Sequence, residues 1–323
     1  MSKKINNKTL LIILILLVGL FLVLRMIRNN RIERSFKTDL VDIDTSRITA
    51  ILLYPRVEDH AEIRFTRSGN GWSVSKGDIT AEAGSNSIQG LLSQLLQIKP
   101  ISLAARNSEK WEEYQLTDSL ATRLKVIESK GKETLDLMVG RFSYQQNNDP
   151  YRAYGERGNV TGTTYVRLGN EDEIYAIDGF LTMSINREFN YWRNQVVLNT
   201  RKQDITKLVF HYPADSGFIA VTHDTIWMIN DVQADSLQMD RYLTSLSYKS
   251  HSSFTDNFTP LSNPDYQLTI EGNNMSPVVV QAFIADTSKY IINSSLNPGS
   301  WFESDADELF AGIFKTRRYF MEE

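Results

Sequence analysis

Residues 48–55 read ITAILLYP, and a closely similar stretch, ITKLVFHYP, returns at residues 205–213. Both stretches are rich in β-branched and aromatic residues, the types that fit a pleated, half-buried strand. Both also end at a Tyr-Pro pair, where the proline lacks the N–H that a sheet ladder needs. Each stretch therefore predicts a β-strand that stops at the same kind of turn.

The similarity continues after these two strands. Each is followed, in order, by a tryptophan in a predicted hairpin, a run of apolar residues at helical spacing, and a Tyr-Gln-Leu tripeptide. In the first copy these are Trp72, residues 87–98 and 114–116, and in the second they are Trp227, residues 236–248 and 266–268. The spacings differ by only a few residues, so the sequence predicts an internal repeat of two lobes, the second one shorter.

Predicted strands outnumber predicted helices in both lobes. Further strands are predicted at residues 62–66, 72–75, 124–127, 134–139, 163–168 and 173–177, and at 267–270, 278–284 and 289–293. They do not alternate regularly with helices, so the fold class is α+β, with an N-terminal transmembrane helix before a duplicated, mostly antiparallel sheet-plus-helix ectodomain. The length exceeds one typical domain, and we assign residues 1–34 to a membrane anchor, 35–200 to the first lobe and 201–323 to the second.

Polar residues mark the predicted starts of three helices. Ser85 or Asn86 is expected to cap the first helix, and Asp178 is expected to cap the second. Residues 304–307, SDAD, are expected to begin the last helix in the manner of a capping box. Leucine and isoleucine recur every three or four residues between 88 and 96, which gives the first helix one apolar face.

An apolar run at residues 10–24, LLIILILLVGLFLVL, has no polar side chain and lies between clusters of lysine and arginine. With its flanks it approaches the length that spans a bilayer core, and the anchor positions are Leu10, Leu14, Leu17, Phe21 and Leu24. No Ala-x-Ala-like site follows, which favours an uncleaved anchor over a cleaved signal peptide. Long domains translocate largely regardless of charge, so we expect a short inside tail and a large outside domain.

Charge is unevenly distributed along the chain. Residues 1–40 are basic, the remainder is acidic, and the whole chain carries a net charge of −4. Nucleic-acid binders need a basic surface to neutralise phosphates, so we expect no nucleic-acid partner. The basic flank is expected to contact anionic membrane lipid instead. The chain has no cysteine, which excludes disulfides, thiolate metal sites and cysteine nucleophiles.

No set of residues has the spacing of a catalytic or metal site, so we predict no catalytic residue, no cofactor and no metal. The four histidines lack the spacing of a zinc helix, and His223-Asp224 is interpreted as a hairpin turn. Residues 73–76, SVSK, lack the partner motifs of penicillin-recognising enzymes. The glycines at 155, 158 and 162 do not match a phosphate-binding loop, and the acidic residues 303–308 lack the glycine of a calcium loop.

An aromatic and polar stretch between residues 144 and 157 has the composition of an exposed surface. Tyrosine and arginine are enriched at the centres of protein interfaces. The candidate partner loop therefore contains Tyr144, Tyr151, Arg152, Tyr154 and Arg157. An ordinary solvent-exposed loop is the alternative interpretation.

Several short motifs extend over nearly the whole chain. They are the Trp hairpin, the leucine-rich helix, Tyr114-Gln115-Leu116, Leu137-Met138-Val139-Gly140, Tyr165-Val166-Arg167, and Ile174-Tyr175-Ala176-Ile177 with Phe180. Together they resemble the domain of unknown function family 4340, although Thr117 departs from the glycine usual at that position. The resemblance implies a single-pass protein of the bacterial inner membrane, often found beside gliding-motility-type ABC transporter components, and it implies no enzyme.

Two classes of function are consistent with these features. The first is a non-enzymatic, membrane-anchored accessory or scaffold protein of the bacterial envelope that contacts a membrane protein partner, an ABC transporter or a gliding-type auxiliary subunit. The second is an extracytoplasmic ligand-binding protein or hydrolase with a site between the two lobes. A pocket with convergent polar groups between the lobes would favour the second class.

Overall fold

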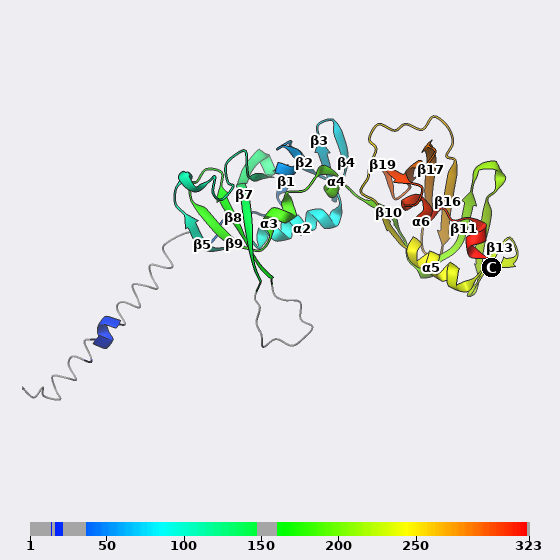
Figure 1. Ribbon diagram of the computed structural model, residues 1–323, viewed down its shortest axis with the longest axis horizontal. Helices are drawn as coiled ribbons and strands as arrows, with labels where there is room; N and C mark the ends of the chain where they lie inside the picture. The colour runs from blue at the N-terminus through cyan, green and yellow to red at the C-terminus, as the bar shows by residue number, and fades with distance from the viewer. Residues whose placement is uncertain (1–13, 15–16, 22–36, 147–159, 322–323) are drawn as a thin grey trace, which may run out of the picture.

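The computed structural model describes residues 14, 17–21, 37–146 and 160–321, and it contains two large β-sheets that follow one another along the chain (Figure 1). The pairings between neighbouring strands that it describes are all antiparallel. The helices beside these sheets are few. The chain is therefore mostly antiparallel sheet, with more β and less α than the predicted α+β class suggests.

Nine strands form the first sheet. They are β1 Ile48–Tyr54, β2 Ile63–Ser68, β3 Gly71–Lys76, β4 Ile79–Glu82, β5 Pro100–Ala105, β6 Thr122–Glu128, β7 Lys132–Gln146, β8 Val160–Leu168 and β9 Ile174–Asp178. Their order across the sheet is β4-β3-β2-β1-β6-β7-β8-β9-β5. The strand predicted from ITAILLYP is β1, and it lies inside the sheet between the Trp hairpin and β6.

Eight strands form the second sheet. They are β11 Ile205–His211, β12 Phe218–His223, β13 Ile226–Ile229, β14 Val232–Gln233, β16 Tyr266–Gly272, β17 Val278–Asp286, β18 Lys289–Ser294 and β19 Asn297–Asp305. Their order is β14-β13-β12-β11-β16-β17-β18-β19, and a separate two-stranded sheet joins β10 (Val196–Asn199) to β15 (Tyr248–Ser250). The order from β14 to β19 matches the order from β4 to β9 strand for strand.

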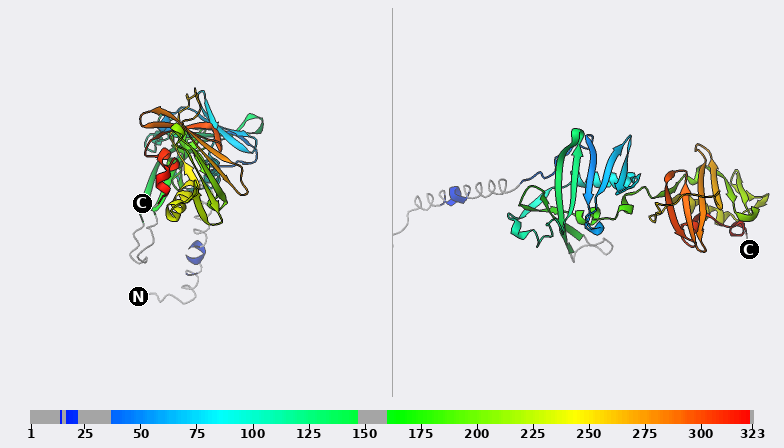
Figure 2. Two further views of the ribbon diagram at one scale, coloured as in Figure 1. Left: turned by 90° about the vertical axis from the view of Figure 1, so that its right-hand side faces the viewer. Right: turned by 90° about the horizontal axis from the view of Figure 1, so that it is seen from above.

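Short helices complete each lobe. The α-helices described are α2 Ser85–Leu96, α3 Leu181–Ile185, α4 Phe189–Trp192, α5 Ser236–Leu246 and α6 Leu309–Ile313. The 3-10 helices are η1 Arg56–Glu58, η2 Ser108–Lys110, η3 Ser129–Gly131, η4 Lys202–Asp204, η5 Pro213–Asp215 and η6 Arg317–Phe320. Helix α2 packs on one face of the first sheet and α5 on one face of the second, and each lobe buries its own apolar core (Figure 2). The ranges 35–200 and 201–323 stay predictions of the domain boundaries.

The predicted cap of the first helix is wrong. Gly84, and neither Ser85 nor Asn86, precedes α2, and no side chain caps the helix. The Gly84 N–H donates to the Trp192 carbonyl at 2.8 Å, and a Cβ on Gly84 would lie 3.2 Å from the Arg193 carbonyl. Close packing against the segment that leaves the first lobe therefore selects glycine here, and a capping side chain would not fit without a shift.

The two other predicted helix starts are also wrong. Asp178 ends β9, and Phe180 precedes α3. Ser304 and Asp305 belong to β19, and α6 begins only at Leu309. Ser304 and Asp305 pair across the sheet with β18, so the helix begins later than predicted, although Ser304 Oγ still accepts the Phe310 N–H of its first turn at 3.0 Å.

The predicted anchor falls mostly outside the described residues. Leu14, Leu17 and Phe21 are helical and exposed, whereas Leu10 and Leu24 lie outside the described part. Among the residues that the structure describes, no helix combines the length and the apolar character needed to cross a membrane.

Candidate functional site

Only the first named residue of the candidate partner loop belongs to the described part of the chain. Of its five predicted residues, Tyr144 lies on β7 and is 67% exposed, while Tyr151, Arg152, Tyr154 and Arg157 lie outside the described residues. Within the described chain, residues 145–146 and 160–161 pair only with each other, because the pairing of β6 ends earlier and the Gly179 N–H after β9 reaches only as far as the Gly162 carbonyl, at 2.8 Å. Figure 1 shows this two-stranded ribbon leaving the first sheet.

Two aromatic rings support the base of the ribbon. Phe142 and Phe180 pack edge to face, with ring centroids 6.0 Å apart. Gly162 lies under Phe180, and a Cβ on Gly162 would be 2.7 Å from that ring. Gly162 therefore leaves room for an aromatic side chain, which agrees with the sequence-based view that it is not part of a phosphate-binding loop.

Motifs that carry the family resemblance meet on the first sheet. The Arg141 N–H donates to the Tyr114 carbonyl at 3.0 Å, and a Cβ on Gly140 would lie 2.2 Å from the same oxygen. Only glycine allows the chain at residues 114–116 to cross β7 this closely. Tyr114 also packs against Tyr165, with ring centroids 4.6 Å apart, so three sequence motifs form one cluster.

Arg167 holds this cluster together from inside. Its side chain is buried, and its guanidinium lies 3.8 Å from the centroid of the Trp111 ring. Its Nε donates to the Leu116 carbonyl at 2.9 Å, and Nη1 donates to the carbonyls of Leu168 and Gly169. Burial lowers the pKa of this guanidinium. These partners are backbone oxygens, so the arginine of Tyr165-Val166-Arg167 fastens a loop to the sheet.

Arg193 joins the two lobes. It lies between α4 and β10, its backbone bridges to Ala83 of the first lobe, and its side chain is only 2% exposed. Nη1 and Nη2 contact the two carboxylate oxygens of Asp256 in the second lobe at 3.0 and 2.8 Å. The guanidinium also lies 3.8 Å from the centroid of Phe254. Such a bidentate, stacked arrangement is specific to arginine, because an ammonium cannot reproduce it.

A second polar side chain crosses the same joint. Asn297, which is 2% exposed, donates from Nδ2 to the Asn194 carbonyl at 2.7 Å. The Nε of Arg193 is buried and has no hydrogen-bond partner among the described residues. The joint is therefore polar, and it depends on Asp256 for its charge balance.

A cavity of about 480 Å³ lies beside the joint. It is lined by the start of α2, by the connecting residues 193–196 and Asn199, and by Tyr248 and Leu296. Its lining is mostly hydroxyl and amide groups. Among the described residues that line it, Arg193 is the one charged side chain, and Asp256 already engages it. The cavity can hydrogen-bond a small polar molecule, but its lining supplies no carboxylate or imidazole for acid–base chemistry.

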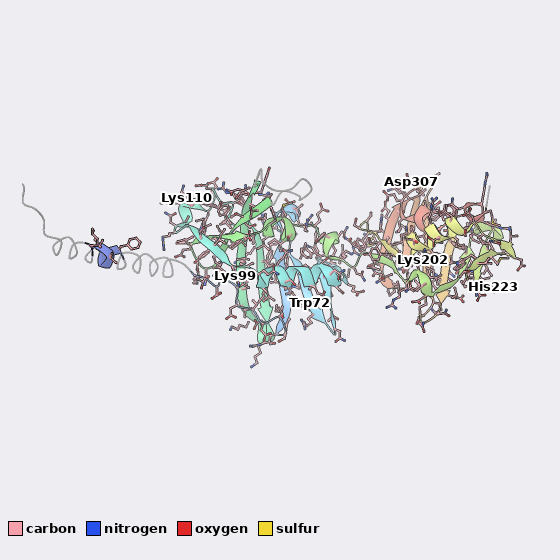
Figure 3. The ribbon with its side chains drawn as sticks, turned by 90° about the horizontal axis from the view of Figure 1, so that it is seen from below. Trp72, Lys99, Lys110, Lys202, His223 and Asp307 are labelled. Atoms are coloured by element: carbon pink, nitrogen blue, oxygen red, sulfur yellow. The ribbon has the colours of Figure 1, made fainter. Side chains whose placement is uncertain are left out.

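A larger cavity, of about 550 Å³, lies within the second lobe between the β12–β13 hairpin and α5. Its lining includes Trp227, Met239 and Leu243 as apolar surface and Thr222, Asp224 and Asp240 as polar groups. Lys202 lies at its edge, forms an ion pair with Asp240 and donates to Thr244 Oγ1 at 2.9 Å. Figure 3 labels Lys202, which precedes β11, and His223, which lies on the β12–β13 hairpin.

The remaining sequence motifs have structural roles. His223 ends β12, and Asp224 lies in the following turn with φ of 58°, so the predicted hairpin turn is confirmed. Residues 73–76 lie within β3, where Lys76 forms an ion pair with Glu58. Across the described ranges, no group of three or more His, Cys, Asp or Glu side chains is arranged to hold a metal ion.

Sequence reasoning named a site between the lobes only as an alternative, and it identified none of the residues of the joint or of the two cavities. Arg193 and Asp256 are 63 residues apart, and a single arginine and a single aspartate carry no local pattern. The cavity of the second lobe did have a signal, because its tryptophan hairpin can be compared position by position with that of the first lobe.

The structure thus defines a β-rich protein of two sheets with matching strand order, joined by the ion pair between the buried Arg193 and Asp256. A family model described as a domain of unknown function, DUF4340, matches residues 74–269. This match covers more than half of the chain, so the protein belongs to the DUF4340 family. No curated protein and no solved structure matches it.

Proposed function

We propose that this protein is a non-enzymatic, membrane-anchored accessory or scaffold protein of the bacterial envelope. Residues 1–34 hold it in the inner membrane as a single-pass anchor, and two duplicated lobes lie outside the cytoplasm. Its partner is a membrane protein, an ABC-type transporter or a gliding-type auxiliary subunit. The apolar run at residues 10–24 supports the anchor, and the motifs shared with DUF4340 proteins support the setting.

The joint at Arg193 is the observation that carries the scaffold proposal. A protein that closes two lobes around a ligand needs a connection whose residues absorb large changes in φ and ψ. Here the connection is held instead by a bidentate ion pair between the buried Arg193 and the partly exposed Asp256, and by the Asn297 hydrogen bond. Leaving a buried charge without its counter-charge costs roughly 3–5 kcal/mol, with the lower end fitting a partly exposed partner, which favours one fixed orientation of the lobes. Fixed spacing of two surfaces is what a scaffold requires.

The test is a pull-down of the full-length tagged protein from its native membrane in mild detergent, followed by quantitative mass spectrometry. The tagged anchor alone, residues 1–34, is the control for adventitious membrane proteins. We expect transporter subunits to be enriched by the full-length protein and not by the anchor. An Asp256→Asn variant, with the joint weakened, should recover less of the same partners while remaining in the membrane. Recovery of the protein alone would contradict the proposal.

The cavity beside the joint favours a second candidate, an extracytoplasmic ligand-binding protein. Its polar lining comes from residues on both sides of the joint, among them Asn86 and Tyr248. Native mass spectrometry of gently purified full-length protein would detect a small molecule held there. Loss of that molecule in an Asn86→Leu variant would support this candidate, and its persistence would exclude the cavity as the binding site.

A further inference from the structure

The first lobe places one of its own arginines on its hairpin tryptophan. Arg67 pairs with Trp72 across the β2–β3 hairpin, and its guanidinium lies 5.2 Å from the centroid of the Trp72 ring. Its Nη2 donates to the Thr45 carbonyl at 3.2 Å. The guanidinium therefore bridges the tryptophan and the turn that precedes β1.

Thr222 holds the position of Arg67 in the second lobe. It pairs with Trp227 across the β12–β13 hairpin, and in both lobes an alanine after the hairpin donates its N–H to the tryptophan carbonyl at 2.9 Å. Lys202 precedes β11 by three residues, as Thr45 precedes β1. The two hairpins can therefore be compared by register, and at the position opposite the tryptophan the first has arginine where the second has threonine.

Because the second lobe has Thr222 where the first has Arg67, the space that corresponds to the Arg67 side chain stays open in the second lobe. The Thr222 hydroxyl bonds within its own turn, to the Asp224 carbonyl at 3.2 Å, and its short side chain cannot bridge to the turn before β11. Thr222, Trp227 and Lys202 all line the 550 Å³ cavity. The second lobe thus has a tryptophan and a preceding turn in the places where those of the first lobe contact the Arg67 guanidinium, but it has no guanidinium of its own there.

The charges around this cavity favour a cation. Asp224 and Asp240 both line it, and Lys202 is the one basic side chain among the described residues that do. The Lys202 ammonium forms an ion pair with Asp240, which leaves the Asp224 carboxylate to attract a positive group. The face of a tryptophan ring also attracts cations, and it stacks best with a planar guanidinium.

We propose that this cavity binds the guanidinium of an arginine side chain presented by a protein partner. The guanidinium stacks on Trp227, and the Asp224 carboxylate and the backbone carbonyls before β11 accept its hydrogen bonds. This inference rests on the proposed scaffold function, because it names the chemistry by which a partner would be held.

The first test is ¹⁹F NMR of the full-length protein in detergent, labelled with 5-fluorotryptophan. The chain has five tryptophans, and a Trp227→Phe variant assigns the signal of interest. The probes are N-acetyl-argininamide and its neutral isostere N-acetyl-citrullinamide. We expect the Trp227 signal to shift with the arginine probe, and the citrulline probe to bind about tenfold more weakly because it lacks the charge. A Trp227 signal that stays fixed, or that responds equally to both probes, would overturn the proposal.

A reciprocal exchange makes the test sharper. Thr222→Arg rebuilds the arrangement of the first lobe and should abolish the Trp227 response. Arg67→Thr should open the equivalent space but give only a weak response at Trp72, because Gly69 stands where the second lobe has Asp224. Thr287→Arg, in the exposed turn between β17 and β18, is the matched control and should leave the Trp227 response unchanged. The signals of the other tryptophans show that each variant is folded.

The outcomes separate this inference from the proposed function. If Thr222→Arg still responds as the unmodified protein does, the cavity does not bind guanidinium. If Trp72 in Arg67→Thr responds as strongly as Trp227 does, the Asp224 carboxylate has no part in binding. The pull-down of membrane partners is independent of these probes, so the scaffold function can stand when the arginine site fails. Conversely, the probe titrations need no partner and remain decisive when the pull-down recovers none.

Discussion

Asp256 neutralises a guanidinium that is buried between the lobes. Replacing it by asparagine keeps its shape but removes its charge, which leaves Arg193 buried without a counter-charge. We expect the free energy of unfolding to fall by about 3 kcal/mol. Urea unfolding followed by tryptophan fluorescence measures this loss.

The control for this prediction is Asp231→Asn. Asp231 is exposed and has φ of 66°, a conformation that asparagine also tolerates. It should change the free energy of unfolding by less than about 0.5 kcal/mol. If the two variants behave alike, the joint does not hold the lobes through its charge.

Glu58 gives the first lobe a pH-dependent contact. Its carboxylate accepts hydrogen bonds from Lys76 Nζ and, at 2.6 Å, from the Phe189 N–H at the start of α4. Burial by itself would raise the pKa of Glu58, but these bonds and the charge of Lys76 outweigh it and hold the pKa below its ordinary value of 4.5. A carboxyl whose pKa is lowered by folding stabilises the fold at pH values above the pKa that it has in the unfolded chain. It loses that contribution as the pH falls through its pKa in the folded protein.

We therefore expect Glu58→Gln to be less stable than the unmodified protein at pH 7, with the difference shrinking as the pH falls below 4.5. Urea unfolding at a series of pH values measures the two stability curves. The exposed Glu112→Gln serves as control and should leave both the stability and its pH dependence unchanged. A difference that is constant with pH would contradict the assignment.

Two glycines in two kinds of element should respond to alanine with opposite signs. A Cβ on Gly140 of β7 would lie 2.2 Å from the Tyr114 carbonyl, whereas a Cβ on Gly90 of α2 meets nothing within 4 Å. We expect Gly140→Ala to destabilise the protein by about 1–3 kcal/mol through overpacking. Gly90→Ala should stabilise it by up to about 1 kcal/mol through helix propensity. Thermal unfolding of the two variants compares them directly, and equal effects would rule out the close crossing at β7.

Strands with strong alternation could be predicted from the sequence, because side-chain burial alone sets their pattern. The predicted residues 267–270, 278–284 and 289–293 all fall within β16, β17 and β18. Strands β5 and β19 were not predicted, since β5 begins at Pro100 and β19 contains Pro298 and Gly299, residues that normally argue against a strand. Both are edge strands of their sheets, where these residues are tolerated.

The sites were less predictable than the elements. The joint depends on Arg193 and Asp256, which only the folded chain brings together. The cavity of the second lobe could have been found from the sequence, because matching the two tryptophan hairpins sets Arg67 against Thr222. What the sequence could not supply is the contact of Arg67 with the turn before β1, which depends on how the lobe packs.

At the scale of the whole molecule, the cysteine-free sequence allows a direct test of the proposed topology. Leu261 is fully exposed in the second lobe, so Leu261→Cys introduces a single reactive thiol. We expect a membrane-impermeant maleimide to label this variant in intact spheroplasts, because the lobes are proposed to lie outside the cytoplasm. Labelling that requires lysis would place them inside. The unmodified protein, which has no thiol, is the control for nonspecific labelling.

The hydrogen bonds that close each lobe have a consequence for biosynthesis. The Gly84 N–H, just before α2, donates to the Trp192 carbonyl at 2.8 Å. The Asp235 N–H, just before α5, donates to the Phe320 carbonyl at the same distance. The first lobe can therefore close as soon as residue 192 leaves the ribosome, but Arg193 must wait for Asp256, 63 residues later. At ordinary rates of translation that wait lasts roughly 3–13 s. During this interval the first lobe of the nascent chain can be folded while Arg193 still lacks its counter-charge. Docking of the two lobes is therefore a separate, later step of folding.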